Sequence, residues 1–207
     1  MANAVLLAAG AGVRLGLGPK ALLPFNGRPL IEHLAAALTD GGCSRVIVVL
    51  GAESRRVRAA ADLSGALTIT NPDWETGMGS SFRAGVAEAL RLAPEESVLV
   101  ALADQPGLTA GTVARLLTHA APDQVSCAGY CLPGGGLRRG HPVLFAPQLA
   151  RAAAAVALGD SGARAFLAAH PGLVDLVDCG SEVSGRDVDT PADLALLDPG
   201  SGTGPAT

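Results

Sequence analysis

Glycines and two cations follow the first apolar run of the chain. The segment Leu7-Ala8-Ala9-Gly10-Ala11-Gly12-Val13-Arg14-Leu15-Gly16 ends that run, and Lys20 follows a few residues later. Lys20 is the only lysine, since the other fourteen basic residues are arginines. Glycine lets backbone N–H groups approach phosphate oxygens closely, and cations neutralise the phosphate charge. The loop is therefore suited to a polyphosphate, with an ordinary turn beside a surface lysine as the alternative.

The glycine spacing of this loop also permits a dinucleotide-binding motif. Such a loop runs directly into a helix, whereas here Pro19 interrupts the chain. The acidic residue after the second expected strand, Glu53, lies 37 residues beyond Gly16, where about 20 would be expected. A Walker A loop does not fit either, because that motif has glycine before its lysine and a hydroxyl residue after it.

Carboxylates stand at two places where they could hold a cation. Asp104 follows the apolar run 97–102, and Asp187 and Asp189 lie two residues apart near the C-terminus. In an extended segment that spacing puts both side chains on one face. The three are candidates for a hard divalent cation, but Mg²⁺ at phosphate sites often uses only one or two carboxylates, so the part of Asp187 stays open. The residues 190–193 (TPAD) are typical of a helix start.

The segment 71–81 (NPDWETGMGSS) connects an expected strand to an expected helix. In the structural interpretation, Ser80 or Ser81 caps that helix. In the functional one, Gly77 and Gly79 let the backbone approach a nucleoside at the helix N-terminus. Both interpretations remain open from the residues alone.

Histidine and cysteine give weaker signals. His141 stands in a Gly-His-Pro loop after two arginines, where a lone histidine is more often structural than functional. The four cysteines form no C-x-x-C pair, and Cys127 and Cys131 have no histidine nearby at zinc spacing. We therefore expect reduced thiols and assign Cys127 and Cys131 no role.

Apolar runs alternate with amphipathic ones along the first 120 residues. The continuous apolar runs that predict buried strands are 3–9, 45–50, 66–70 and 97–102. The helices expected between and after them are 29–39, 53–61, 80–92 and 109–120. This order predicts a three-layer α/β fold with a mostly parallel sheet and ligands at the carboxyl ends of the strands.

The pattern weakens after residue 122. The elements predicted there are a strand at 124–129, a glycine-rich loop at 133–140, helices at 147–155 and 162–169, and a strand at 173–177. We predict one domain over 1–197. The last residues, 198–207 (DPGSGTGPAT), hold turn formers without core residues and predict a disordered tail.

Composition excludes several classes of protein. The chain has 207 residues, 49% of them hydrophobic and 16% charged, with a net charge of −4. Neither that charge nor the 3% aromatic content favours nucleic-acid binding. No apolar run reaches the roughly 20 residues of a membrane span, and no secretory signal is visible. We therefore expect a soluble, cytoplasmic protein with no nucleic-acid or membrane partner.

Taken together and in order, the motifs resemble those of the MobA-like nucleotidyltransferase family. The matching segments are LAAGAGVRLG…K, NPDW…GMGSS, LADQP, GHPVLF, GDSGAR and DVDTPADL. They cover residues 4–197 and are most similar to the molybdenum cofactor cytidylyltransferase type. In that family LAAG with a G-x-G-[ST]-S loop goes with cytidine, whereas guanylyl enzymes carry LAGG. CTP is therefore the expected donor, with GTP as the alternative.

The resemblance implies a three-layer, Rossmann-like (GT-A-like) nucleotidyltransferase fold and assigns roles to individual positions. The positions that it assigns to the nucleotide are Leu7, Ala8, Ala9, Gly10, Gly12, Arg14, Lys20, Asn71, Gly77, Gly79, Ser80, Ser81 and Asp104. Lys20, Arg14 and Asp104 would be catalytic, and Mg²⁺ would bind Asp104 and Asp189. On the acceptor side it implies His141, Asp160 and Arg164.

The implied reaction is attack by the terminal phosphate of a molybdopterin-type acceptor on the α-phosphorus of CTP, with release of pyrophosphate. Because that nucleophile is already anionic, catalysis would depend on alignment and charge neutralisation. A target molybdoenzyme or its chaperone would be a partner. The alternatives are another phosphorylated acceptor, an NAD(P)-linked oxidoreductase and a non-catalytic nucleotide-binding protein.

Overall fold

A seven-stranded sheet forms the middle layer of the protein. The computed structural model describes residues 1–132, 134–180 and 185–198. Across the sheet the strand order is β5-β4-β1-β6-β8-β7-β9. In that order, the strands are Leu67–Thr70, Arg45–Leu50, Ala2–Ala8, Ser97–Leu102, Leu137–Phe145, Val125–Cys131 and Val174–Asp178. Only β8 runs antiparallel to its neighbours, so the predicted mostly parallel sheet is confirmed.

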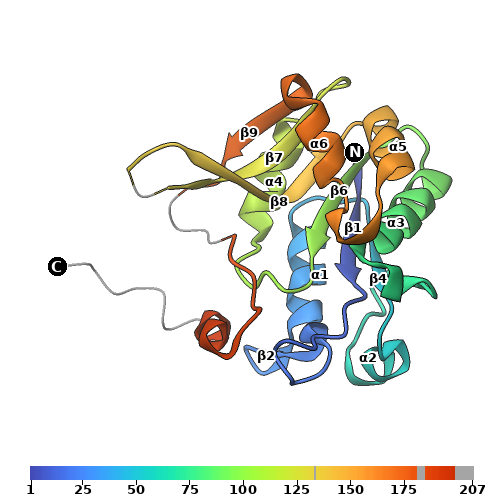
Figure 1. Ribbon diagram of the computed structural model, residues 1–207, viewed down its shortest axis with the longest axis vertical. Helices are drawn as coiled ribbons and strands as arrows, with labels where there is room; N and C mark the ends of the chain where they lie inside the picture. Colours follow the sequence, from blue (N-terminus) through green and yellow to red (C-terminus); the bar gives the residue numbers. More distant parts are fainter. Residues whose placement is uncertain (133, 181–184, 199–207) are drawn as a thin grey trace.

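Helices cover both faces of the sheet and complete the predicted three layers (Figure 1). One face carries α1 (Leu30–Asp40), α2 (Ser54–Ala60) and α4 (Ala110–Thr118). The other carries α3 (Met78–Leu92), α5 (Pro147–Val156) and α6 (Arg164–Ala169). Successive strand residues point to opposite faces, so in β1 Leu6 packs into the first core and Val5 into the second. A strand buried on both sides is expected to be largely apolar, as β1 is. Its one polar residue, Asn3, is buried and donates from Nδ2 to the carbonyl of Ala89 at 3.2 Å.

The predicted helices and strands all exist, with ends within two residues of the prediction. The remaining connections are short. They contain the 3-10 helices η1 (Lys20–Leu22), η2 (Trp74–Thr76), η3 (Gly159–Ser161), η4 (Pro171–Leu173) and η5 (Pro191–Leu197), and the small β2–β3 hairpin (Pro24–Phe25, Arg28–Pro29).

The glycine-rich loop predicted over 133–140 is wrong in its second half. Gly134, Gly135 and Gly136 have positive φ values of 94°, 97° and 84° and form the tip of a hairpin. From Leu137 onward the chain is strand β8, which pairs with both β7 and β6. The residues 137–140 pair with β7 alone, and β6 pairs with β8 only over Val143–Phe145. The ladder with β7 outweighs the poor strand propensity of this glycine- and arginine-containing stretch. As a result, His141 lies in a strand of the sheet and not in a loop.

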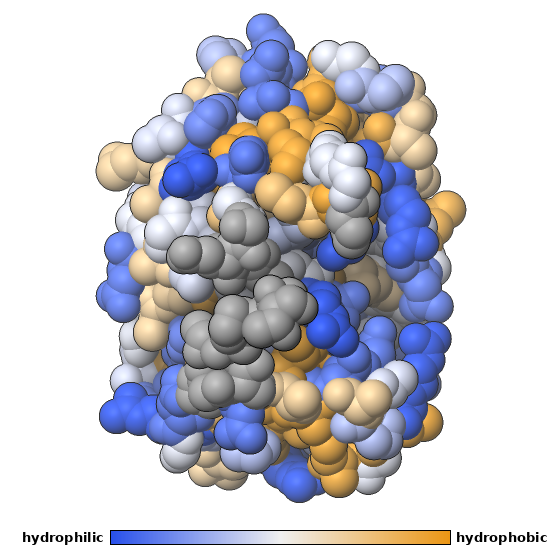
Figure 2. Space-filling model, turned by 90° about the vertical axis from the view of Figure 1, so that its left-hand side faces the viewer, coloured by the Kyte–Doolittle hydropathy of each residue, from blue (hydrophilic) through white to orange (hydrophobic). Residues whose placement is uncertain are grey.

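All four cysteines are free thiols. Burial raises the pKa of Cys127 to about 12, which makes it unreactive at neutral pH. Cys131, at the end of the same strand, is exposed. No helix in the described ranges is long and apolar enough to cross a membrane. Except for Asp198, the tail predicted over 198–207 lies outside the described residues. Figure 2 shows the face that carries the β7–β8 hairpin, where hydrophilic residues are interspersed with smaller hydrophobic areas.

Candidate active site

A cleft opens at the edge of the sheet where β1 and β6 end, and it consists of two adjoining hollows. The loop hollow, of about 440 Å³, lies among the glycine loop, Lys20 and the start of α3. The sheet hollow, of about 580 Å³, lies among β8, the segment 160–164 and the segment 185–189. The residues that line both hollows, and so mark the seam between them, are Leu7, Arg14, Lys20, Met78, Leu102, Asp104, Asp160 and Asp189.

The glycine loop forms a turn beyond the end of β1 and does not enter a helix. Gly12 has a φ of +64°, and a Cβ there would lie 2.1 Å from the carbonyl oxygen of Gly18, so only glycine fits. The N–H of Leu15 closes the turn by donating to the Gly12 carbonyl at 3.2 Å. The chain then reaches η1, which begins at Lys20. The predicted nucleotide-binding positions of this first segment all line the loop hollow, namely Leu7, Ala8, Ala9, Gly10, Gly12, Arg14 and Lys20.

Lys20 lies between two carboxylates at the seam. Its Nζ is 3.0 Å from Oδ2 of Asp104 and also pairs with Oδ1 of Asp189. The side chains of Lys20 and Asp104 keep 17% and 24% of their exposure, so water screens this pair only in part. Partial burial lowers the pKa of Lys20, but the hydrogen bonds and charges of Asp189 and Asp104 outweigh it and raise the pKa above its usual value. Lys20 is therefore a cation at neutral pH.

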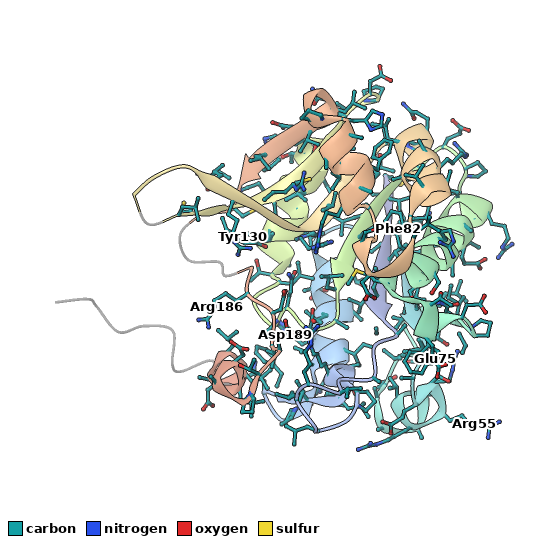
Figure 3. All side chains as sticks on the ribbon, viewed as in Figure 1. Arg55, Glu75, Phe82, Tyr130, Arg186 and Asp189 are labelled. Atoms are coloured by element: carbon teal, nitrogen blue, oxygen red, sulfur yellow. The ribbon has the colours of Figure 1, made fainter. Side chains whose placement is uncertain are left out.

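The extended segment 185–189 brings Asp189 to Lys20. The N–H of Val188 donates to the carbonyl of Asp104 at 2.8 Å, and the Val188 side chain is fully buried. The capping box predicted for the following residues is present at the start of η5. Figure 3 shows Asp189 turned toward the centre of the molecule, whereas Arg186 points away from it. A residue 169 positions beyond Lys20 thus reaches the same site.

Asp187 occupies a different place from Asp189. Its Oδ1 accepts a hydrogen bond from Nε2 of Gln105 at 2.6 Å. Asp187 lines the sheet hollow only, whereas Asp189 lines both hollows. The two carboxylates therefore have separate partners, and the seam holds Asp104 and Asp189.

The start of α3 forms another wall of the loop hollow. The helix begins at Met78, and Gly77, with a φ of +106°, is its cap residue. The prediction that Ser80 or Ser81 caps this helix is therefore wrong, because both serines lie buried within its first turn. Gly77 ends η2 in a conformation that favours glycine. The helix therefore begins at Met78, two residues before the predicted start at residue 80.

A buried hydrogen-bond network supports this wall. Nδ2 of Asn71 donates to the hydroxyls of Ser80 at 2.8 Å and Ser81 at 3.0 Å. Gly79 lies against the backbone of Leu158, where a Cβ would come within 2.9 Å of the Leu158 nitrogen. Of the five predicted nucleoside residues, Gly77 and Ser81 line the loop hollow. Asn71, Gly79 and Ser80 are not among the residues that line it, and they hold the wall in place.

The sheet hollow brings together the three predicted acceptor residues. His141, Asp160 and Arg164 all line it, with Arg138 and Arg139 of β8 beside them. Its apolar lining includes Phe82 of α3, which is labelled in the right-hand part of Figure 3. Guanidinium groups beside an apolar surface suit an organic molecule that carries a phosphate.

His141 is neutral in this setting. Burial lowers its pKa to about 4, and the cations of Arg139 and Arg164 act in the same direction while Asp187 opposes them. A neutral imidazole contributes hydrogen bonding without charge. His141 is therefore suited to orienting a ligand and not to neutralising one.

Residues 4–174 match the family described as the MobA-like NTP transferase domain. The chain belongs to this family. Over 188 residues it is 50% identical to the nicotine blue oxidoreductase of Paenarthrobacter nicotinovorans, covering 90% of this chain and 91% of that protein.

Solved structures agree with the family. A nucleotidyl transferase from Methanothermobacter thermautotroptrophicus (Mth528) superposes with a TM-score of 0.80 at 26% identity, over 97% of each chain. The manganese complex of Rv0371C from Mycobacterium tuberculosis H37Rv superposes with a TM-score of 0.73 at 26% identity, over 95% of this chain and 97% of that one. The predicted family and fold are thereby confirmed, and both support an enzyme of the nucleotidyltransferase class.

One direct observation indicates that the residues at the seam could hold a divalent cation. Oδ1 of Asp104 is buried and has no hydrogen-bond partner among the described residues. Burial raises the pKa of Asp104, although Lys20 opposes the shift. A buried carboxylate oxygen without a donor is a suitable ligand for Mg²⁺, which needs few protein ligands beside phosphate. No cluster of three or more metal-binding side chains occurs in the part of the chain that the structure describes.

Some of the cleft residues were not predicted from the sequence. Trp74 and Glu75 line the loop hollow from η2, and Arg138 and Arg139 line the sheet hollow from β8. Trp74 is the only tryptophan of the chain, which is a signal that could have been used. Arg138 and Arg139 of β8 were assigned to a loop, so the sequence did not indicate that they would face the cleft. Gln105 directly follows Asp104, but its partner Asp187 is distant in sequence.

Proposed function

We propose that the protein transfers CMP from CTP to the terminal phosphate of a molybdopterin-type acceptor and releases pyrophosphate. The observation that carries this proposal is the seam, where the Lys20 cation meets Asp104 and Asp189 between the two hollows. A donor in the loop hollow and an acceptor in the sheet hollow would meet at that point. The family and the fold support the transfer of a nucleotidyl group.

The chain's own residues would act by position and charge. Glycine-loop amides would hold the triphosphate, and Lys20 and Arg14 would stabilise the charge that develops on the leaving pyrophosphate. The sheet hollow would hold the acceptor with its phosphate toward the seam. Since the acceptor phosphate is anionic, no side chain has to remove a proton from it. The remaining rate acceleration would come from holding the acceptor phosphate in line with the α-phosphorus of CTP.

Asp104 and Asp189 would hold a divalent cation. Mg²⁺ bound there would neutralise phosphate oxygens. The support is the partnerless Asp104 oxygen, together with the manganese in the related Rv0371C complex. We propose Mg²⁺ as the cofactor on this basis.

The identity of the donor base and of the acceptor goes beyond what the family and the fold support, and each rests on its own observation. Support for CTP comes from Leu7-Ala8-Ala9-Gly10 and from Gly77-Met78-Gly79-Ser80-Ser81, which match the cytidine pattern of the family. Support for an acceptor with both a ring system and a phosphate comes from the apolar lining and the arginines of the sheet hollow. GTP as donor and another phosphorylated acceptor are the competing outcomes. Delivery of the product to a molybdoenzyme or its chaperone belongs to the same proposal.

Pyrophosphate release tests the proposal. The protein is incubated with CTP, Mg²⁺ and molybdopterin, and with GTP in place of CTP. Lys20→Ala should reduce the rate by about 100-fold or more, because one lost charge at a transition state typically costs that much. Arg55→Ala, on the exposed side of α2, is the matched control and should keep full activity. Activity of Lys20→Ala within a fewfold of wild type would contradict the assigned role.

A second candidate function follows from the relative that shares 50% identity over 90% of this chain. That protein is named a nicotine blue oxidoreductase, so we propose NAD(P)H-linked reduction of nicotine blue as the competing activity. The glycine loop opposes this proposal, since it leads into a turn and η1 and not into the helix that a dinucleotide loop requires.

Spectrophotometry separates the two candidates. Oxidation of NAD(P)H is followed at 340 nm with nicotine blue and without CTP. The main proposal expects no protein-dependent oxidation, and the second candidate expects oxidation that survives Lys20→Ala. Pyrophosphate release in the same preparation would identify the nucleotidyltransferase. Tight CTP binding with neither activity would indicate a nucleotide-binding protein without catalysis.

A further inference from the structure

The segment 185–189, which we call the strap, is held at three points besides the ion pair of Asp189 with Lys20. At its middle, Nε2 of Gln105 donates to Asp187 at 2.6 Å, and the Val188 N–H donates to the Asp104 carbonyl at 2.8 Å. Gln105 is buried, with 7% exposure, and it follows Asp104 directly at the end of β6. The strap is therefore fastened to the same strand end that carries Asp104.

The start of the strap lies against the only tyrosine of the chain. A Cβ on Gly185 would come within 2.1 Å of Cε2 in the ring of Tyr130. Gly185 does not have a left-handed φ, so glycine is required here for space and not for backbone conformation. The Tyr130 hydroxyl also donates to the carbonyl of His141 in β8, and the ring itself is buried, with 6% exposure. Figure 3 shows Tyr130 between the hairpin and the strap.

These contacts determine where Asp189 lies. Asp189 is joined to Lys20, but Lys20 is a flexible side chain that also pairs with Asp104, so this ion pair alone does not fix the backbone of the strap. The contacts that tie the strap to the ends of the sheet strands include those of Gln105 and Tyr130. The N–H of Asp189 also donates to Oδ2 of Asp193 at 3.3 Å, and the Arg138 guanidinium donates to the carbonyl of Gly185 at 3.5 Å. A shift of the strap would move Asp189 away from Asp104, because the two residues belong to different segments.

We propose that Gln105 and the Tyr130 ring are positioning residues for the divalent-cation site of Asp104 and Asp189. Neither residue binds the cation in this scheme. Gln105 also lines the sheet hollow, and both act on the cation site by holding the strap in register. Groups that orient metal ligands typically contribute about 10- to 100-fold to metal affinity. The inference rests on the proposed metal site, but it does not require that the reaction be CMP transfer.

Binding of Mn²⁺ alone tests the inference without turnover. Free Mn²⁺ is counted by electron paramagnetic resonance as the full-length protein is titrated. Gln105→Leu and Gly185→Ala should each weaken Mn²⁺ binding by about 10-fold or more. Tyr130→Phe keeps the ring against Gly185 and should bind Mn²⁺ like the wild type, which separates the ring from its hydroxyl.

Each variant has a matched control elsewhere in the chain. Gln148→Leu also removes a glutamine–aspartate hydrogen bond, to Asp123 at 3.1 Å, on the exposed surface of α5. Gly172→Ala adds a Cβ that meets no atom within 4 Å. Both should leave Mn²⁺ affinity unchanged. Melting temperatures of all variants show whether each one folds.

The outcomes separate this inference from the proposed function. Wild-type affinity in folded Gln105→Leu and Gly185→Ala would overturn the inference, as would a wild-type protein that does not bind Mn²⁺. Weakened binding in both variants with unchanged controls would support it, even if no CTP is consumed. In that last case the proposed function alone would fail. Where the chain is active, the variants should raise the Mg²⁺ concentration needed for half-maximal rate and recover the rate at high Mg²⁺.

Discussion

At the scale of single residues, Lys20 is the most informative position. The chain uses arginine at fourteen of its fifteen basic positions, yet it has lysine at the seam of the cleft. An ammonium group is compact and presents three donors that rotate freely, whereas a guanidinium is planar and needs more room. Between two carboxylates and the triphosphate that we propose, a small group that can change partners would fit better than a rigid fork. The sequence alone marked Lys20, but only the fold brings Asp189 to it.

Two glycines of the loop should respond differently to the same substitution. Gly12→Ala places a Cβ 2.1 Å from a carbonyl oxygen at a φ of +64°, so we expect destabilisation by about 1–3 kcal/mol. A Cβ on Gly10 meets no atom within 4 Å, so Gly10→Ala should fold normally and weaken only CTP binding. Urea denaturation and equilibrium dialysis with CTP measure the two effects. Equal stability of the two variants would contradict the structure of this loop.

His141 should make the folded state sensitive to mild acid. Its pKa is about 4 in the folded protein, below the usual 6.5, so the unfolded chain binds the proton more readily than the folded one. The stability contributed by the neutral imidazole is present above pH 6.5 and is lost as the pH falls toward 4, at about 1.4 kcal/mol per pH unit. His141→Gln removes this loss. The variant should show a shallower fall in unfolding free energy between pH 6.5 and 4 than the wild type. Parallel curves would show that His141 does not have this pKa.

At the scale of helices and strands, the sequence predicted the strands whose residues are buried on both faces. It missed the strand that forms because of its pairing with neighbouring strands. The runs 45–50 and 97–102 coincide with β4 and β6, because a strand covered by helices on both faces must be continuously apolar. β8 was missed as a whole: Leu137–Gly140 contains two arginines and a glycine and was assigned to a loop, and no strand was predicted over 141–145. Its pairing with β7 and, from Val143 onward, with β6 makes it a strand. The strap was recognised by its aspartates, but its contacts with Gln105 and Tyr130 depend on segments far apart in the chain.

The network at the start of α3 predicts a combined effect on stability and nucleotide binding. Asn71→Ala removes both hydrogen bonds to the buried serines, which should cost about 1–3 kcal/mol of unfolding free energy. Because the first turn of α3 lines the loop hollow, the KM for CTP should rise with little change in kcat. Thr39→Ala, on the exposed surface of α1, serves as the control. Unchanged CTP affinity in a destabilised Asn71→Ala would show that this wall does not contact the nucleotide.

At the scale of the whole molecule, one sheet joins two unlike halves. The parallel strands β5, β4, β1 and β6 support the loop hollow, and the antiparallel β8 with its neighbours supports the sheet hollow. The strand order reverses between β1 and β6, since the chain leads from β1 to β4 on one side and from β6 to β7 on the other, and Asp104 follows β6. In open α/β sheets, ligands bind outside the carboxyl ends of the strands at such a point. The seam lies there, so the fold would bring the proposed donor and acceptor together.

A ligand that spans this seam should stabilise the entire protein. CTP with Mg²⁺ would contact segments from both halves, so unfolding would require its release. At 100 times its dissociation constant, the ligand should add about 2.7 kcal/mol to the unfolding free energy. Thermal melts with CTP, GTP, ATP and NADPH, each with Mg²⁺, compare the possible ligands directly, and Asp104→Asn should lose the part of the stabilisation that requires Mg²⁺. Stabilisation by NADPH but not by CTP would favour the oxidoreductase, because the cleft would then be holding a dinucleotide and not a triphosphate.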